Sequence, residues 1–436
     1  MANTRTSPDT PTVAVVMSGG GARGAYEAGV LEYLLDEFPR RLGHPVRFDI
    51  VTGTSVGAIH ACYLAATQGE ANTGTRLADI WRSFQLDAVF PLRPTDLVRV
   101  PWRLSGLARL RANVGEGDET APQRLPGLFD TRWLDAIVFT QVPWEQIRRN
   151  IDGGRLRALA IAATEIATGR SVVFVENGTA NTPINWGRDP FVIARPAHIG
   201  PQHALASAAI PMLFAAIRIE HTYYCDGGLR LNTPLAPALR LGADRILVIG
   251  LRHPATPEEE DRVARQREAS FVSPTYLAGK ALNALMLDRI ETDVDRMRLF
   301  NEVLKTGIQA YGDEFLDRIN EPIVRLRKRP YRVVRDVFLR PSEDLGVIAA
   351  EAMHGGVRSH GMRSWLSQNL ARYAARGAFG EADLLSYLFF DKAYTERLIE
   401  LGRKDAERAA NDLAELFEGT ADPEATGNGR GDGRRT

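Results

Sequence analysis

The chain has 436 residues, and its 54 basic and 54 acidic side chains give a formal net charge of zero. This balance argues against nucleic-acid binding through overall charge. Two cysteines are too few for a disulfide framework or a cysteine-based zinc site. The sequence shows neither an apolar signal segment at its start nor a run of about 18 apolar residues. These features favour a cytoplasmic protein without a transmembrane segment, which can still attach to a membrane surface.

Strands and helices alternate along the first 250 residues. A polar tail covers 1–12, and residues 12–17 and 46–54 then have the composition of buried strands, each followed by glycines and a helical pattern. Further strands are predicted at 157–166, 170–177, 189–195, 243–251 and 331–341. This alternation predicts an α/β fold around a central, mostly parallel sheet.

Several segments interrupt or follow this alternation. Residues 85–130 are rich in Pro and Arg and are interpreted as an insertion that could serve as a lid. Their stretch 93–111 carries five Arg beside Trp102; a solvated helix with its Leu side packed inward is favoured over contact with anionic lipid. We expect a catalytic domain over 13–345 that includes a helical excursion at 255–330. A C-terminal helical region at 346–418 and a disordered tail at 419–436 complete the predicted organisation.

The segment GTSVG, Gly53 to Gly57, is the strongest chemical signal. It matches G-x-S-x-G and lies between a predicted strand and a predicted helix, which is the context of a nucleophile elbow. The alternative is a glycine-flanked helix cap, because Ser and Thr cap helices well. The strand–turn–helix context favours Ser55 as a nucleophile.

A serine nucleophile needs a base, and Asp226, followed by Gly227 and Gly228, is the candidate. An Asp before two glycines is more often a turn, so this motif is weak by itself. A Ser–Asp–His order could be completed by His253 or His354, but neither lies in a distinctive motif. His60 follows Ser55 on the same predicted helix and is expected to point away from the hydroxyl.

The segment SGGGARG has two interpretations besides a plain tight turn, which would make little use of three consecutive glycines. Gly19, Gly21 and Gly24 match the G-x-G-x-x-G pattern of dinucleotide-binding turns, for which Asp49 would be the ribose-binding acid. The amides of Gly19–Gly21 could instead form an oxyanion hole facing Ser55. We favour the oxyanion hole, because a dinucleotide would compete with the elbow for the same end of the sheet.

Four segments, SGGGARGAYEAGVL, GTSVGA, ASAAIPMLF and YCDGGLRLNTPL, follow one another in an order that resembles the patatin-like phospholipases. The resemblance covers Val13 to Leu251. It implies a three-layer α/β sandwich and a lipid acyl hydrolase, a phospholipase A or esterase, that uses a Ser–Asp dyad, no catalytic His, no metal and no cofactor.

By position, the resemblance makes Ser55 the nucleophile and Asp226 its base. It assigns Gly19, Gly20, Gly21 and Arg23 to the oxyanion-hole loop. The glycines that support these motifs are Gly24, Gly53, Gly57, Gly227 and Gly228. A nucleotide-binding module, a Ser-His-Asp esterase and a non-catalytic scaffold are the alternatives. The expected partner is a lipid or ester substrate.

Overall fold

The computed structural model describes most of the predicted α/β region and part of the C-terminal helices. The described residues are 10–84, 131–178, 192–254, 290–312, 314–327, 330–354 and 386–420, with 124–125, 127, 186, 256, 258, 261 and 265. Most of the 85–130 insertion, the basic stretch 93–111 and nearly all of both predicted tails lie outside these residues.

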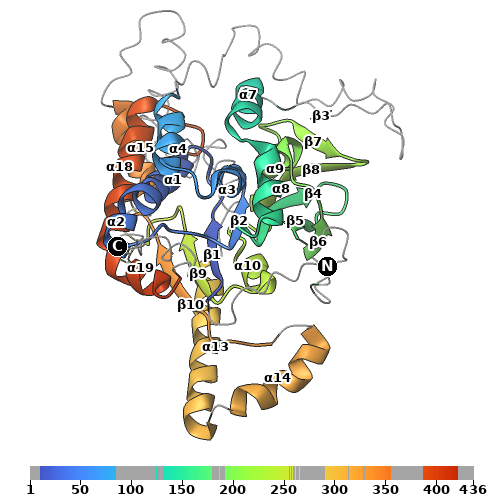
Figure 1. Cartoon of the computed structure of the whole chain (residues 1–436). Coiled ribbons are helices and arrows are strands. Elements are labelled where there is room, and N and C mark those ends of the chain that lie inside the picture. The colour runs from blue at the N-terminus through green and yellow to red at the C-terminus, as the bar shows by residue number, and fades with distance from the viewer. Residues whose placement is uncertain are drawn as a thin grey trace, which may run out of the picture.

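A ten-stranded sheet forms the centre of the molecule (Figure 1). Its strands are β1 (Val13–Met17), β2 (Ile50–Thr54), β3 (Arg124–Leu125), β4 (Ala158–Glu165), β5 (Ser171–Asn177), β6 (Val192–Pro196), β7 (Ala216–Ile219), β8 (Thr222–Asp226), β9 (Arg245–Ile249) and β10 (Arg335–Leu339). The main order is β10-β9-β1-β2-β4-β8-β7-β3, and β5 pairs with β4 and β6.

The sheet is parallel in one half and mixed in the other. Strands β10, β9, β1, β2 and β4 pair in parallel, whereas β4–β5, β4–β8, β7–β8 and β3–β7 are antiparallel. The antiparallel pairs β4–β5 and β7–β8 have short connections, which cannot carry the chain back for parallel pairing. The predicted α/β class is confirmed, and the antiparallel half is the feature that strand–helix alternation did not indicate.

Helices cover both faces of the sheet. They are α1 (Gly24–Glu32), α2 (Pro39–Leu42), α3 (Val56–Thr67), α4 (Thr73–Arg82), α7 (Arg132–Gln141), α8 (Trp144–Asp152), α9 (Pro201–Ser207), α10 (Leu235–Leu241), α13 (Ile290–Tyr311), α14 (Glu314–Arg327), α15 (Leu345–His354), α18 (Lys392–Arg408) and α19 (Ala410–Phe417).

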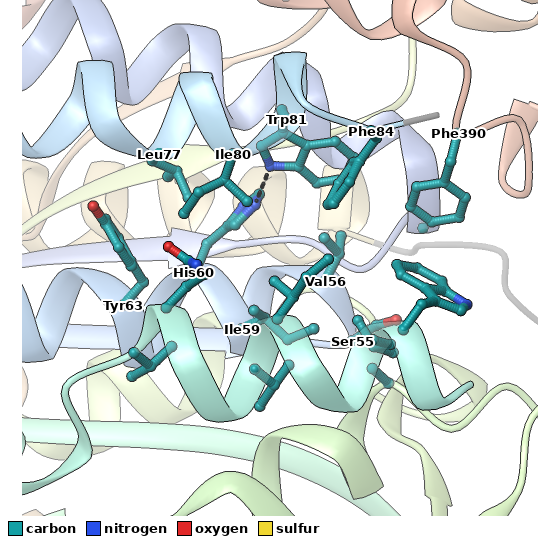
Figure 2. A pocket seen from close by; sticks show the side chains of 18 of the residues that line it. Ser55, Val56, Ile59, His60, Tyr63, Leu77, Ile80, Trp81, Phe84 and Phe390 are labelled. Carbon is teal, nitrogen blue, oxygen red and sulfur yellow. Dashed lines mark hydrogen bonds between the residues drawn. The ribbon is translucent and has the colours of Figure 1, made fainter. Parts of the chain in front are cut away.

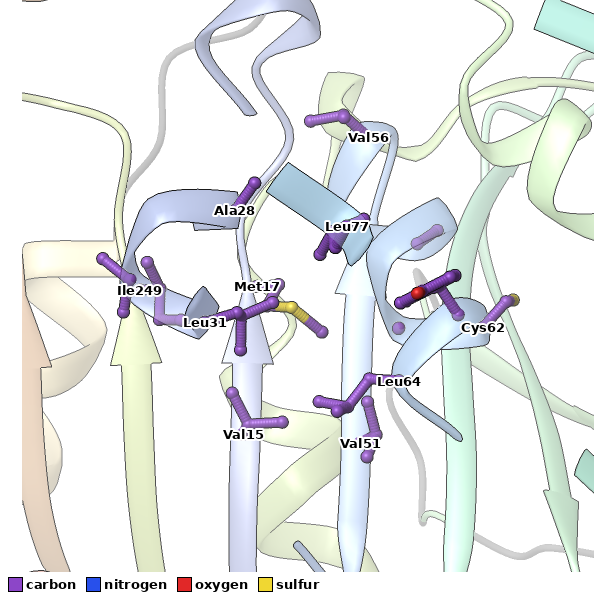
Figure 3. Packing of buried hydrophobic residues seen from close by; sticks show 14 of the residues in the cluster. Val15, Met17, Ala28, Leu31, Val51, Val56, Cys62, Leu64, Leu77 and Ile249 are labelled. Atoms are coloured by element: carbon purple, nitrogen blue, oxygen red, sulfur yellow. The ribbon is translucent and has the colours of Figure 1, made fainter. Parts of the chain in front are cut away.

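Alternating side chains of β1 divide the core into two clusters. Val15 and Met17 pack with α1 and α3 on one face (Figure 3), whereas Ala14 and Val16 pack with α10 and α13 on the other. This period-two pattern places the sheet between two helical layers, as a three-layer sandwich requires.

The C-terminal helical region packs on the α1 side of the sheet. The Tyr26 hydroxyl of α1 donates to Asp405 Oδ2 of α18 at 3.2 Å, and Thr395 Oγ1 of α18 donates to the carbonyl of Trp81 in α4 at 3.3 Å. Helices α13 and α14, from the predicted helical excursion, extend below the rest of the described chain in Figure 1. Among the described helices, none combines the length and apolarity needed to cross a membrane.

Candidate active site

Ser55 occupies a sharp turn between β2 and α3. Its backbone has φ 56° and ψ −125°, a strained conformation for a residue with a side chain, which costs about 1–3 kcal/mol. Gly53 and Gly57 permit this turn because a methyl group on Gly53 would lie 2.0 Å from the Gly57 carbonyl oxygen, and one on Gly57 would lie 2.6 Å from that of Met17. The geometry is that of a nucleophile elbow.

The register of β4 brings Ser55 and Asp226 together. β2 runs parallel to β4 and ends with Thr54 opposite Ala162. β8 approaches β4 from the other direction and ends with Asp226 opposite Ala163. The two strand ends therefore meet beside consecutive residues of β4, and Ser55 Oγ donates a hydrogen bond to Asp226 Oδ2 at 2.7 Å.

Asp226 is completely buried, and its surroundings fit a base. Its Oδ1 accepts from the Gly228 amide at 2.7 Å, and its own amide donates to the Ala209 carbonyl at 2.8 Å. Burial raises the pKa of Asp226 to about 7, although the hydrogen bonds from Ser55 and Gly228 oppose the rise. A carboxyl with this pKa can exchange a proton near neutral pH.

The residue before Asp226 takes no part in this exchange. Burial raises the pKa of the neighbouring Cys225 thiol to about 12. Its thiolate is therefore a negligible species at neutral pH.

The elbow has a further support that the sequence motifs did not assign. Ser207 Oγ accepts from the Ser55 amide at 2.9 Å and donates to the Ala162 carbonyl at 2.5 Å. Ser207 therefore fixes the elbow to β4 from α9. It lies within ASAAIPMLF, so the motif signalled the segment without identifying the role of this residue.

The glycine loop follows β1 and faces Ser55. Met17 pairs with Gly53, so the loop and the elbow leave neighbouring strands at the same edge. A methyl group on Gly19 would lie 3.0 Å from Ser55 Cβ, and Gly21, with φ 55°, lines the same pocket as Ser55. Gly24 opens α1 against the side chain of Val56.

The backbone amides of the glycine loop differ in whether they already donate to an acceptor within the protein. The Gly19 amide donates to the Asn232 carbonyl at 3.0 Å, and Asn232 Nδ2 donates to the Gly19 carbonyl at 3.2 Å. The Ala22 amide donates to the Tyr387 carbonyl at 2.8 Å. Within the described part of the chain, the amides of Gly20 and Gly21 donate to no protein acceptor. Among the described residues, the loop amides that remain open to a ligand are therefore those of Gly20 and Gly21.

Arg23 contacts the segment that precedes α18. Its Nε donates to Ser386 Oγ at 2.8 Å, and its guanidinium lies 4.1 Å from the ring centre of Tyr387. Together with the bond from Ala22, these contacts fix the loop to the segment that precedes α18. No sequence motif indicated this contact.

Of the two histidines considered as bases, the structure describes the side chain of His253. His253 Nδ1 is 2.9 Å from the Pro341 carbonyl, and the side chain of His354 is outside the described residues. Both carboxylate oxygens of Asp226 have their partners in Ser55 and Gly228. Asp49, the acid that a nucleotide site would need, accepts from the Val13 amide where β1 begins, at the edge opposite the glycine loop.

An apolar pocket begins at Ser55 and follows α3 (Figure 2). Helices α3, α4, α7 and the segment before α18 form its wall. Its lining residues include Val56, Ile59, His60, Tyr63, Leu77, Ile80, Trp81, Phe84, Trp133, Ile137, Phe214 and Phe390. The eight steps along the helix from Ser55 to Tyr63 span roughly 12 Å, about the reach of an acyl chain of ten carbons. Within the described residues, no cluster of three or more His, Cys, Asp or Glu side chains could hold a metal ion.

Comparison with known proteins identifies a family. The family model described as patatin-like phospholipase matches residues 15–239. The chain is 27% identical over 227 residues to a cGAMP-activated phospholipase of Pseudomonas aeruginosa, covering 51% of this chain and 55% of that protein. It is 26% identical over 242 residues to the cGAMP-activated phospholipase of Escherichia coli, covering 52% and 54%. The chain thus spans about half the length of these curated relatives.

A solved structure, VipD from Legionella pneumophila, is also similar. The matched region covers 90% of this chain and 67% of the VipD chain, at 14% identity and a TM-score of 0.30. That score is too low to support any argument.

Proposed function

Because the chain belongs to the patatin-like phospholipase family, we propose that it is a lipid acyl hydrolase in which Ser55 and Asp226 cleave carboxylic esters. The observation that carries the proposal is the 2.7 Å hydrogen bond from Ser55 Oγ to a buried Asp226, at a strained elbow beside an apolar pocket. The pocket positions the acyl group, and the dyad supplies nucleophile and base.

In the first step, Asp226 Oδ2 accepts the Ser55 proton while Ser55 Oγ bonds to the ester carbonyl carbon. The carbonyl oxygen becomes an oxyanion, for which the Gly20 and Gly21 amides are the proposed donors; one such donor is typically worth about 10²–10³ in rate. The N-terminus of α3, directly after Ser55, also favours this charge. The tetrahedral intermediate collapses, the bond to the leaving alcohol breaks, and Asp226 returns the proton to that oxygen.

In the second step, water hydrolyses the acyl-enzyme. Asp226 accepts a proton from water as its oxygen bonds to the acyl carbon, and the proton then passes to Ser55 Oγ as the acid leaves. This cycle needs one group that changes protonation state near neutral pH, which fits the raised pKa of Asp226, about 7.

The pocket favours acyl chains of medium length over acetyl groups. Its lining is apolar from Val56 to Tyr63, and a chain of roughly ten carbons matches the length of the pocket along this part of α3. The names of the relatives add activation by cGAMP, but this chain spans only half of them. The proposal is therefore limited to ester hydrolysis.

The test compares Ser55→Ala and Asp226→Asn with the wild-type chain on p-nitrophenyl octanoate and on phosphatidylcholine vesicles. Ser83→Ala is the matched control, because Ser83 is exposed after α4 and its hydroxyl donates to the Ile80 carbonyl, away from the dyad. We expect both dyad variants to lose at least 10³ in kcat while the control retains full activity. Turnover that survives Ser55→Ala in pure protein would refute the proposal.

A further inference from the structure

Behind the glycine loop lies a buried polar chain that the dyad mechanism does not use. It links Ser18 at the start of the loop to Glu27 in α1, His60 in α3 and Trp81 in α4, and its side chains are buried. The Ser18 amide donates to Glu27 Oε1 at 2.8 Å, and His60 Nδ1 lies 2.8 Å from Glu27 Oε2. The Trp81 indole N–H donates to His60 Nε2 at 2.9 Å, as the dashed line in Figure 2 shows.

The donors and acceptors allow only one arrangement of protons. An indole nitrogen is a donor only, so His60 Nε2 must be the acceptor and carry no proton. The proton of a neutral imidazole then sits on Nδ1 and is donated to Glu27 Oε2. Glu27 accepts on both oxygens, from Ser18 and from His60, as an ionised carboxylate does. Every bond in the chain therefore has a fixed direction.

This chain joins the two parts of the proposed site that must keep a fixed separation. Ser18 directly precedes the glycines, and His60 lies on the helix that begins after Ser55. Trp81 lines the apolar pocket and stacks on Phe390 at 6.0 Å with an interplanar angle of 7°. A displacement of about 1 Å between a donor and the reacting atom can cost 10² in rate.

We propose that Glu27, His60 and Trp81 are positioning residues that hold the glycine loop at a fixed distance from the nucleophile helix through hydrogen bonds of fixed direction. This inference rests on the proposed ester hydrolysis. His60 and Trp81 line the acyl pocket and Glu27 binds the Ser18 amide, so the hydrogen-bonded chain acts on the reacting atoms through Ser18 and the loop.

The substitution Glu27→Gln tests the direction of the bonds. If the oxygen of the new glutamine accepts from Ser18, its amide faces His60 Nδ1, and His60 must move its proton to Nε2, where the Trp81 indole also donates. If the glutamine side chain is reversed, its amide faces the Ser18 N–H instead. Either arrangement sets two donors against each other, which leaves a buried polar group unsatisfied.

A second substitution should relieve this conflict. Trp81→Phe removes the indole N–H and keeps an aromatic ring, so His60 Nε2 becomes free to carry the proton. His60 Nδ1 can then accept from the side-chain amide of the glutamine, whose oxygen still accepts from Ser18. The proposal therefore predicts that Trp81→Phe rescues Glu27→Gln, which a role in packing or in net charge does not predict.

The experiment measures kcat and KM for p-nitrophenyl acetate in the two single variants and the double variant. We expect Glu27→Gln to lower kcat by about tenfold or more with KM within twofold, and Trp81→Phe alone to lower it by less than threefold. The double variant should return to within threefold of Trp81→Phe. A double variant as slow as Glu27→Gln, or an unaffected Glu27→Gln, would overturn the proposal.

Two matched controls isolate the network. Glu32→Gln removes another buried carboxylate of α1, one that binds Arg82 of α4 and not the glycine loop. Ile399→Val removes one carbon from the buried core where α18 packs on α1, without changing a hydrogen bond. Both controls should leave kcat for the acetate ester within twofold of wild type. A loss as large as that of Glu27→Gln in either control would contradict a specific role of the network.

A spectroscopic measurement keeps the proposal testable if Glu27→Gln does not fold. In ¹⁵N-histidine-labelled wild-type protein, the signals of His60, identified by their absence in His60→Gln, should be those of a neutral ring protonated on Nδ1. A ring protonated on Nε2 or on both nitrogens refutes the proposal. Activity that survives Ser55→Ala is a separate result and counts against the proposed function. If Ser55→Ala is inactive but the effects of Glu27→Gln and Trp81→Phe on kcat are purely additive, the result counts against the network alone.

Discussion

Replacing Asp226 by Asn should abolish turnover and make the fold more stable at alkaline pH. The carboxyl is completely buried, and burial raises its pKa from an ordinary 3.8 to about 7. A raised pKa means that the folded chain holds this proton more tightly than the unfolded chain. The protonated carboxyl therefore contributes to the free energy of unfolding below pH 3.8. This contribution is lost as the pH rises through the folded-state pKa of about 7, because the ionised carboxylate must then stay buried.

The size of this effect follows from the shift. About three pKa units correspond to roughly 4 kcal/mol lost from the wild-type free energy of unfolding between about pH 3 and pH 8. Roughly half of this loss falls between about pH 5.5 and pH 8.5. The asparagine of the variant cannot ionise, and its side-chain oxygen can still accept from the Gly228 amide, so the variant avoids the loss.

Urea unfolding at half-unit pH steps measures this difference directly. The free energy of unfolding of Asp226→Asn minus that of wild type should rise by about 2 kcal/mol from about pH 5.5 to pH 8.5. Asp79→Asn, which changes an exposed carboxylate of α4, is the control and should show a flat difference. A flat difference for Asp226→Asn as well would refute the claim that this carboxylate is held at a cost to the fold.

Three further outcomes are expected from the same geometry. Wild-type kcat/KM should fall about tenfold per pH unit below about 7, because protonated Asp226 cannot accept the Ser55 proton; a profile that is flat down to about pH 5 would contradict its role as base. Gly21→Ala should lower kcat by about 10²–10³ in folded protein, because φ of residue 21 is 55° and the new methyl group would lie 2.2 Å from the Tyr387 carbonyl oxygen. A change in kcat under threefold argues against the loop as oxyanion donor. Ile59→Phe should fill the pocket halfway along α3, so that kcat/KM falls about tenfold or more for decanoate but little for acetate esters; equal losses for both would place the acyl chain elsewhere.

The sequence predicted the parts of the site that local chemistry defines. The alternation of strands and helices indicated an α/β fold around a mostly parallel sheet, and the glycines around Ser55 indicated a crowded turn. The motif around Asp226 made it only a weak candidate for the base, and the family resemblance strengthened the pairing with Ser55. The contact itself depends on the register of β4 with both β2 and β8. Register between strands so distant in sequence is not visible in a single chain.

The contacts of the C-terminal segment could not be predicted in the same way. Tyr387 and Phe390 lie more than 300 residues after the loop and the elbow, and they carry no motif. Their position follows from the packing of α18 on α1, where Tyr26 binds Asp405. Likewise, the sequence marked Gly19 as an oxyanion donor, but its amide is occupied by Asn232, a backbone pairing that only the folded chain reveals.

The formation of an acyl-enzyme on Ser55 tests the central claim most directly. Wild-type protein is mixed with p-nitrophenyl octanoate, quenched in acid within the first turnover and analysed by intact mass and peptide mapping. We predict one octanoyl group per chain on the peptide that contains Ser55, and none in Ser55→Ala. An octanoyl group on another residue, or continued turnover with no labelled Ser55, would contradict the account.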